Sequence, residues 1–229
     1  MSLDDDHYHY QDRISASREP EDLLLTHDEP GDLVKRLTQA WINERAAPEI
    51  LKYENDCVNG LVAKCDDQQA VIDELDTGND ASILISILYQ TELERIKFVL
   101  RSYLRTRISK IERHCQFILK DLSSRRKLSK AETSYAESYL KTTQDHYHSS
   151  FLSSLPLTLQ VQDDVVFHRK LNMVSEPSLD EGVFCRINED IGYFQLGEGD
   201  PIVMETGQIY IFRYGAIRAL LQRGQISLI

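Results

Sequence analysis

The chain has 229 residues, of which 41% are hydrophobic, and its formal net charge is -11 at pH 7. This length suffices for one or two domains with a real core, and the acidity argues against a broad phosphate-binding surface. No apolar run approaches the roughly 18 residues of a membrane span, and the N-terminus lacks the basic and apolar regions of a signal peptide. The sequence therefore predicts a cytosolic or nuclear protein.

Residues 1–30 are predicted to form a disordered acidic tail. They contain nine Asp or Glu residues against only Arg13 and Arg18, and few apolar residues. Such a charge imbalance disfavours folding, because too little apolar surface is present to offset the lost chain entropy. His7 and His9 lack a fixed scaffold, so a solvated tail is a better interpretation than a metal site.

A helical domain is predicted for residues 31–152. Apolar residues recur at three- and four-residue spacing in its first helix: Leu33, Leu37, Ala40 and Trp41. A second helix is expected to start at Pro48 and to end near residue 75. Residues 81–122 then show one helical pattern of about forty residues without Gly or Pro. The last helix follows Ser129, where Glu132 completes a capping box.

A small β-rich domain is predicted for residues 165–229, after a linker at residues 153–164, and we expect it to be a separable module. Short strand-like segments alternate there with Gly, Pro, Asp and Asn. The segment 209–214 carries bulk on both faces, so we expect a central strand with residues 226–229 pairing nearby. A short helix should end at Gly224. The predicted fold class is α+β, an N-terminal all-α helical (A) domain followed by a small β-rich (B) domain.

Residues 91–114 concentrate positive charge in an otherwise acidic chain. Seven basic residues lie here: Arg95, Lys97, Arg101, Arg105, Arg107, Lys110 and Arg113. On a helical wheel they point in many directions, and Glu92, Glu94 and Glu112 interrupt them. Phosphate contacts usually need a concentrated positive face, so a stand-alone DNA-binding protein using helix 91–114 is the less favoured alternative. An ordinary core helix with local ion pairs is another.

The same helix has a strongly apolar face, and Arg107 falls within it. An unpaired charge at such a place would cost several kcal/mol, so we predict a buried ion pair with Glu44 of the first helix. The alternative is that Arg107 lays its methylenes on the core and keeps its charged end in water. The residues predicted to form the core or an interface are Trp41, Leu93, Ile96, Phe98, Leu100, Tyr103, Leu104 and Ile111.

The length of the third helix predicts contact with another protein. Residues 83–88, "ILISIL", are apolar on all sides, which normally means burial all round. A helix of forty residues is about 60 Å long, whereas a domain of about 120 residues has a radius of gyration of about 14 Å. The helix must therefore project, break or pack on another chain, and a projecting apolar helix needs a partner.

No motif for catalysis occurs in the sequence. There is neither a G-x-x-x-x-G-K-[ST] phosphate loop nor a G-x-S-x-G elbow. "LGEGDP" (196–201) has two glycines but no following helix, which favours a turn. His146 and His148 are two residues apart and so point to different helix faces. We expect no enzyme, no cofactor and no metal site.

Three segments of the sequence are "AWINERAAPEIL", "ELERIKFVLRSYLRTRISKIE" and "GQIYIFRYGAIRALLQRGQISLI". Together they resemble the Sld-five subunit family of the eukaryotic GINS DNA replication complex. The resemblance covers about residues 32–229 and keeps the family's order of motifs. It implies a nuclear, non-catalytic scaffold subunit of a heterotetramer with three other GINS subunits. It also implies that the complex joins the MCM helicase and a RecJ-like cofactor, with DNA contact at most indirect. The basic helix would then belong to an intersubunit bundle.

Overall fold

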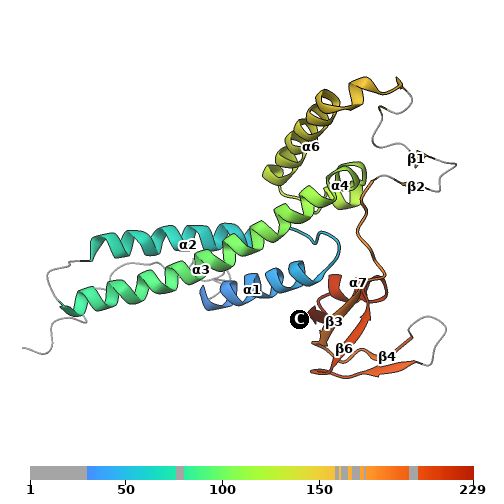
Figure 1. The fold of residues 1–229 in the computed structure, drawn as a ribbon. Coiled ribbons are helices and arrows are strands. Elements are labelled where there is room, and N and C mark those ends of the chain that lie inside the picture. The colour runs from blue at the N-terminus through green and yellow to red at the C-terminus, as the bar shows by residue number, and fades with distance from the viewer. Residues whose placement is uncertain are drawn as a thin grey trace, which may run out of the picture.

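The computed structural model describes residues 30–75, 80–157, 160, 165–166, 171–172, 174–195 and 201–229. A helical part is followed by a small β-rich part, which confirms the α+β prediction (Figure 1). The predicted acidic tail, apart from Pro30, and about half of the predicted linker lie outside the described residues. The domain boundaries therefore stay predictions. No helix among the described residues is long and apolar enough to cross a membrane.

Three helices form the body of the helical part: α1 (Pro30–Ala46), α2 (Asn55–Glu74) and α3 (Asp80–Arg113). Their shared core consists of Leu33, Leu37, Cys57, Val58, Leu61, Val99 and Tyr103. The prediction that Pro48 begins the second helix is wrong, because residues 47–54 form a loop. Carbonyl groups of this loop accept hydrogen bonds from cationic side chains of α3 instead of from a helical backbone.

Helix α3 is shorter than the predicted forty-residue helix. It has 34 residues and ends at Arg113, because His114 has φ -118° and ψ 28°, outside the α-helical range. The chain then turns into α4 (Cys115–Lys120) and α5 (Leu122–Arg125). Even so, α3 is about 50 Å long at 1.5 Å per residue. Together with α2 it projects well beyond the start of α1 (Figure 1).

Helix α6 (Lys130–Ser150) begins with the predicted capping box. The Ser129 Oγ accepts a hydrogen bond from the Glu132 N–H at 3.1 Å, and the Glu132 carboxylate accepts one from the Ser129 N–H at 2.8 Å. A one-turn helix, η2 (Leu152–Ser154), follows. A second core joins α4 and α6 to the end of α3: Ile50, Ile111, Cys115, Ile118 and Ala136. The start of α6 is thereby fixed against the C-terminal end of α3.

The β-rich part centres on a three-stranded antiparallel sheet in the order β6-β3-β7. Its strands are β3 (Gly182–Ile187), β6 (Ile209–Arg213) and β7 (Ile226–Leu228). The prediction that residues 209–214 form the central strand is wrong: β3 is central, and the terminal strand pairs with β3. The bulk on both faces of β6 reflects one buried and one exposed face, not burial on both sides.

Shorter elements complete the β-rich part. Helix α7 (Tyr214–Gln222) follows β6 directly, and the chain turns after it at Gly224, whose φ of 77° suits glycine. Two antiparallel pairs accompany the sheet: β1 (Val165–Val166) with β2 (Leu171–Asn172), and β4 (Gly192–Phe194) with β5 (Ile202–Met204). The core of this part lies between α7 and the sheet.

Candidate protein interface

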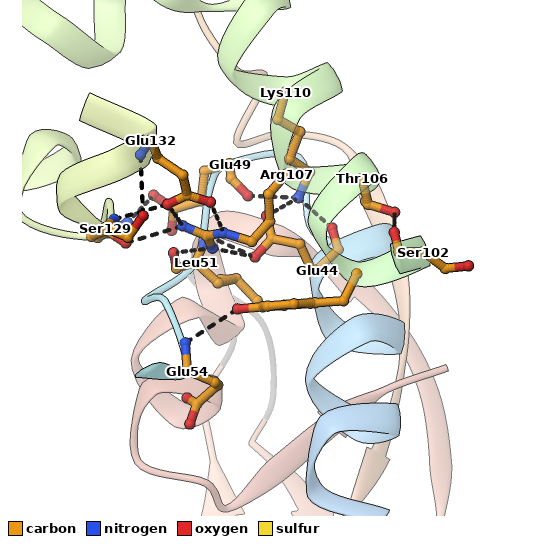
Figure 2. A network of polar contacts seen from close by, with 12 residues as sticks. Glu44, Glu49, Leu51, Glu54, Ser102, Thr106, Arg107, Lys110, Ser129 and Glu132 are labelled. Atoms are coloured by element: carbon orange, nitrogen blue, oxygen red, sulfur yellow. Dashed lines mark hydrogen bonds and ion pairs between the residues drawn. The ribbon is translucent and has the colours of Figure 1, made fainter. Parts of the chain in front are cut away.

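Arg107 is fully buried near the C-terminal end of α3. Its guanidinium donates to Glu44 at 3.0 Å, the contact expected from the sequence, and to both oxygens of Glu132 at 2.7 and 3.0 Å (Figure 2). Two further bonds go to the carbonyl oxygens of Leu51 at 2.9 Å and of Lys127 at 3.1 Å. Because no part of Arg107 reaches water, it does not extend its charged end to the surface.

The surroundings of Arg107 keep it charged. Burial alone lowers its pKa, but the hydrogen bonds that it donates to Glu132 and the charges of Glu44 and Glu132 raise the pKa above its ordinary value. The rings of Tyr53 and Tyr103 lie 5.2 and 5.6 Å from the guanidinium carbon, at cation–π distance. The sequence predicted one carboxylate partner. It missed Glu132, which belongs to a helix whose position depends on tertiary packing.

Lys110, one turn after Arg107, provides a second cation for Glu44. Its ammonium group lies 3.0 Å from the Glu44 carboxylate and also donates to the carbonyl groups of Glu44 and Glu49. Burial lowers the pKa of Lys110, and the Glu44 charge opposes this effect. The Glu44 carboxylate therefore bonds to two cations of α3, which fixes the last turn of α1 against that helix.

Three other cations of the basic helix pair with carboxylates of the same helix. Arg95 lies 2.9 Å from Glu92, and Lys97 and Arg101 each lie 3.6 Å from Glu94. These pairs are largely exposed, so they neutralise charge locally and contribute little to stability. Within the described residues, α3 therefore lacks the concentrated positive face that DNA binding by this helix requires.

The buried polar cluster has no spare group for a ligand. Among the described residues, Gln225 Oε1 is the only buried side-chain nitrogen or oxygen without a hydrogen-bond partner. The same part of the chain has no group of three or more His, Cys, Asp or Glu that could hold a metal ion. The arrangement around Arg107 therefore fixes α1, α3 and α6 together.

Helix α3 exposes large apolar side chains on one side, and we call this surface the helical apolar face. It consists of Leu84, Ile87, Leu88 and Phe98, which are 59, 57, 58 and 60% exposed. Their spacing places them on one side of the helix. The neighbouring Ile83, Ile85 and Tyr89 are also exposed. The described residues do not provide the burial that "ILISIL" predicts, and an exposed patch of this kind is typical of a surface that contacts another protein.

The residues predicted for a core or interface fall into three groups. Leu93, Tyr103 and Ile111 are buried. Trp41, Ile96, Leu100 and Leu104 are half-buried beside the same cores. Phe98 is exposed, and its ring packs edge-on against Trp41 with 6.2 Å between centroids. The prediction omitted Val99, which is buried because α2 covers an additional side of α3.

A groove of about 360 Å³ lies between α2 and α3. Its lining is mainly apolar and includes Leu61, Val71, Tyr89, Leu93 and Ile96. Lys64, Asp67 and Glu92 also line the groove. A concave, mainly apolar site with a few charged groups suits side chains of a helix from another protein.

The β-rich part exposes a second apolar surface, the outer sheet face. Phe184, Ile209 and Ile211 are 58, 54 and 60% exposed, and the strand register places Phe184 directly opposite Ile211. Arg186 and Arg213 lie on the same face. An antiparallel sheet with one covered face usually carries polar residues on the other. These isoleucines and Phe184 therefore mark a second candidate contact surface.

Two family models match the chain, one in each part. The model described as "GINS complex protein helical bundle domain" matches residues 66–151, and the model "DNA replication complex GINS protein SLD5 C-terminus" matches residues 177–229. A Schizosaccharomyces pombe protein named DNA replication complex GINS protein sld5 is 36% identical over 91% of this chain and 98% of its own length. The chain belongs to the SLD5 family. This confirms the resemblance found in the sequence.

Further SLD5 relatives extend the match beyond fungi. The Arabidopsis thaliana protein is 34% identical over 93% of this chain and 96% of its own length. The Bos taurus protein is 32% identical over 91% of this chain and 93% of its own length. Both are named as DNA replication complex GINS proteins. The helical model covers the helical apolar face and Arg107, and the C-terminal SLD5 model covers β3, β6 and β7.

Proposed function

We propose that this chain is a non-catalytic structural subunit of a GINS heterotetramer formed with three other GINS subunits. In this proposal the complex supports the assembly and activity of the replicative MCM helicase, together with a RecJ-like cofactor, at DNA replication forks in the nucleus. Contact of this chain with DNA is at most indirect. Its own contribution is to hold neighbouring subunits in place through packed surfaces.

The observation that carries the proposal is the helical apolar face on a member of the SLD5 family. Leu84, Ile87 and Leu88 are each more than half exposed. Fully burying a Leu or Ile side chain contributes about 1.5–3 kcal/mol, so covering the exposed parts of these three would contribute roughly 3–5 kcal/mol before the cost of association. The outer sheet face offers a second surface of the same kind.

The relatives and the charge distribution support the same role. The SLD5 relatives carry names that place them in the GINS complex of DNA replication. In the described residues, the basic groups of α3 are either buried in the Arg107 cluster or paired with carboxylates along the helix, apart from Arg105 and Arg113. The basic helix thus serves packing within and between proteins better than it serves phosphate binding.

Co-expression with the three other GINS subunits tests the proposal. Native mass spectrometry should find the wild-type chain in a four-chain assembly. The double variant Leu84→Asp, Leu88→Asp should be lost from it, because a carboxylate in a dry interface is costly. The matched control is Leu122→Asp with Leu157→Asp, two leucines that are 69 and 83% exposed outside the helical apolar face. Full assembly of the first double variant, or a wild-type chain that stays alone, would contradict the proposal.

A further inference from the structure

We propose that Glu49 is an interdomain anchor, which holds the β-rich part in one orientation on the helical part. Glu49 lies in the loop between α1 and α2 and is 5% exposed. One carboxylate oxygen accepts hydrogen bonds from Tyr214 Oη at 2.8 Å and Arg218 Nε at 2.6 Å, both on α7. The other accepts from Arg218 Nη2 and from Lys127 Nζ, both at 2.7 Å. One side chain therefore bonds to both parts.

Apolar contacts around Glu49 bind the same two parts together. Ala47 is 3% exposed and belongs to the core of the β-rich part, and Ala46 and Leu51 pack against that core. The end of α1 and the following loop thus complete a core that the strands and α7 alone leave open. Because a buried carboxylate is costly without partners, the bidentate contact with Arg218 is required for this packing.

Helix α1 makes a second connection, at the edge of β7. The Leu228 N–H donates to Asn43 Oδ1 at 2.8 Å, and the Leu228 carbonyl accepts from Gln39 Nε2 at 3.2 Å. These backbone groups point away from β3, since the next residue, Ile229, bonds to the Phe184 carbonyl on the β3 side. Two side-chain amides thereby take the place of a neighbouring strand. Glu49 contacts α7, and α1 contacts β7. These two separate contacts together prevent the β-rich part from rotating about either one.

Glu49 is also connected to the Arg107 cluster (Figure 2). Lys127 donates to Glu49 through its ammonium group, and its carbonyl accepts a bond from Arg107. Lys110 bonds to the Glu49 carbonyl and to the Glu44 carboxylate. Burial by itself raises the pKa of Glu49, but the bonds from Lys127, Tyr214 and Arg218 bring its pKa below the ordinary value and keep it ionised. A shift at the junction of α3 and α6 would therefore displace the anchor.

Distances between two spin labels on the full chain test the anchor. The labels are attached at Asn59→Cys on α2 and Tyr193→Cys on β4, both exposed, with Cys65→Ser removing a half-buried thiol. Pulsed electron–electron double resonance on the chain in its assembled complex should give one narrow peak in the distance distribution between the two labels. Glu49→Gln and Arg218→Ala should each cause loss of that single narrow peak. Glu189→Gln, which neutralises an exposed carboxylate of the β-rich part, should leave the peak unchanged.

Each of the two test variants can decide the question if the other fails to fold. The Arg218 side chain is 36% exposed, so Arg218→Ala still decides the question if Glu49→Gln does not fold. An unchanged narrow peak in a folded variant of this pair overturns the anchor. Failure of the proposed function appears separately, as failure to form the four-chain complex. In that case the same distances, measured on the full chain by itself, decide whether Glu49 holds the two parts together.

Discussion

Replacing Arg107 with Met should lower the free energy of unfolding by roughly 3–5 kcal/mol, because two carboxylates lose their buried cation. The side chains of Glu44 and Glu132 are only 1 and 10% exposed, so water cannot readily replace the guanidinium. Two carbonyl groups, of Leu51 and Lys127, would lose their donors as well. The loss is large relative to the roughly 5–15 kcal/mol that is typical of a folded domain.

The structure also predicts which carboxylate depends more on Arg107. Glu132 binds the guanidinium with both oxygens, whereas Glu44 uses one. Without Arg107, Glu44 keeps Lys110 at 3.0 Å and the Leu51 N–H at 3.3 Å. In double-mutant cycles we therefore expect a coupling energy of about 2–3 kcal/mol between Arg107→Met and Glu132→Gln, and about 0.5–2 kcal/mol between Arg107→Met and Glu44→Gln.

Urea unfolding of the full chain, followed by circular dichroism, measures both quantities. The control is Arg101→Met. Arg101 lies on the same helix, its side chain is 56% exposed, and its guanidinium lies 3.6 Å from the Glu94 carboxylate. Loss of this exposed cation should cost under about 1 kcal/mol. The reasoning is refuted if Arg107→Met costs no more than Arg101→Met. A larger coupling with Glu44 than with Glu132 would refute the geometric part alone.

Three further variants test other parts of the fold. Burial raises the pKa of Tyr103 to about 12, so as the pH rises the Tyr103 hydroxyl ionises in the unfolded chain before it does so in the folded chain. The free energy of unfolding should therefore fall by about 1.4 kcal/mol per pH unit between about pH 10 and 12. Urea unfolding across that range should show a shallower decline for Tyr103→Phe, and an equal decline would speak against the assignment. Ser129→Ala should cost about 1 kcal/mol by removing the cap of α6, whereas the exposed Ser134→Ala should cost much less in the same assay. Deleting residues 227–229 removes most of β7 and the bonds to Gln39 and Asn43; an unchanged circular dichroism spectrum and unfolding midpoint would be evidence against that placement.

Periodicity predicted that this part of the chain is helical, and it placed Arg107 among apolar residues, with Glu44 as the expected partner. It could not show where α3 ends, because neither Gly nor Pro marks His114. There the His114 Nδ1 lies 3.0 Å from the carbonyl oxygen of Ser175, a residue far along the chain. The next residue, Cys115, is buried in the core shared with α6. The helix ends for tertiary reasons that leave no local pattern.

The missed carboxylates show the same limit. The capping box already explained Glu132 at its position in the sequence, so no local pattern pointed to a distant cation as its partner. Glu49 follows Pro48 in a short segment without helical or strand periodicity, and its partner Tyr214 is 165 residues away. For β6, the sequence indicated bulk on both faces, but it could not distinguish burial inside this chain from a surface that faces another protein.

Glu132 also limits how the sequence can drift during evolution. Gln satisfies the capping box as well as Glu does, so the rules of helix initiation alone would accept Gln at this position. The buried guanidinium would not, because it needs the negative charge and both oxygens. Positions 107 and 132 are therefore expected to change together or to stay fixed, although each would look replaceable if its own helix were considered alone.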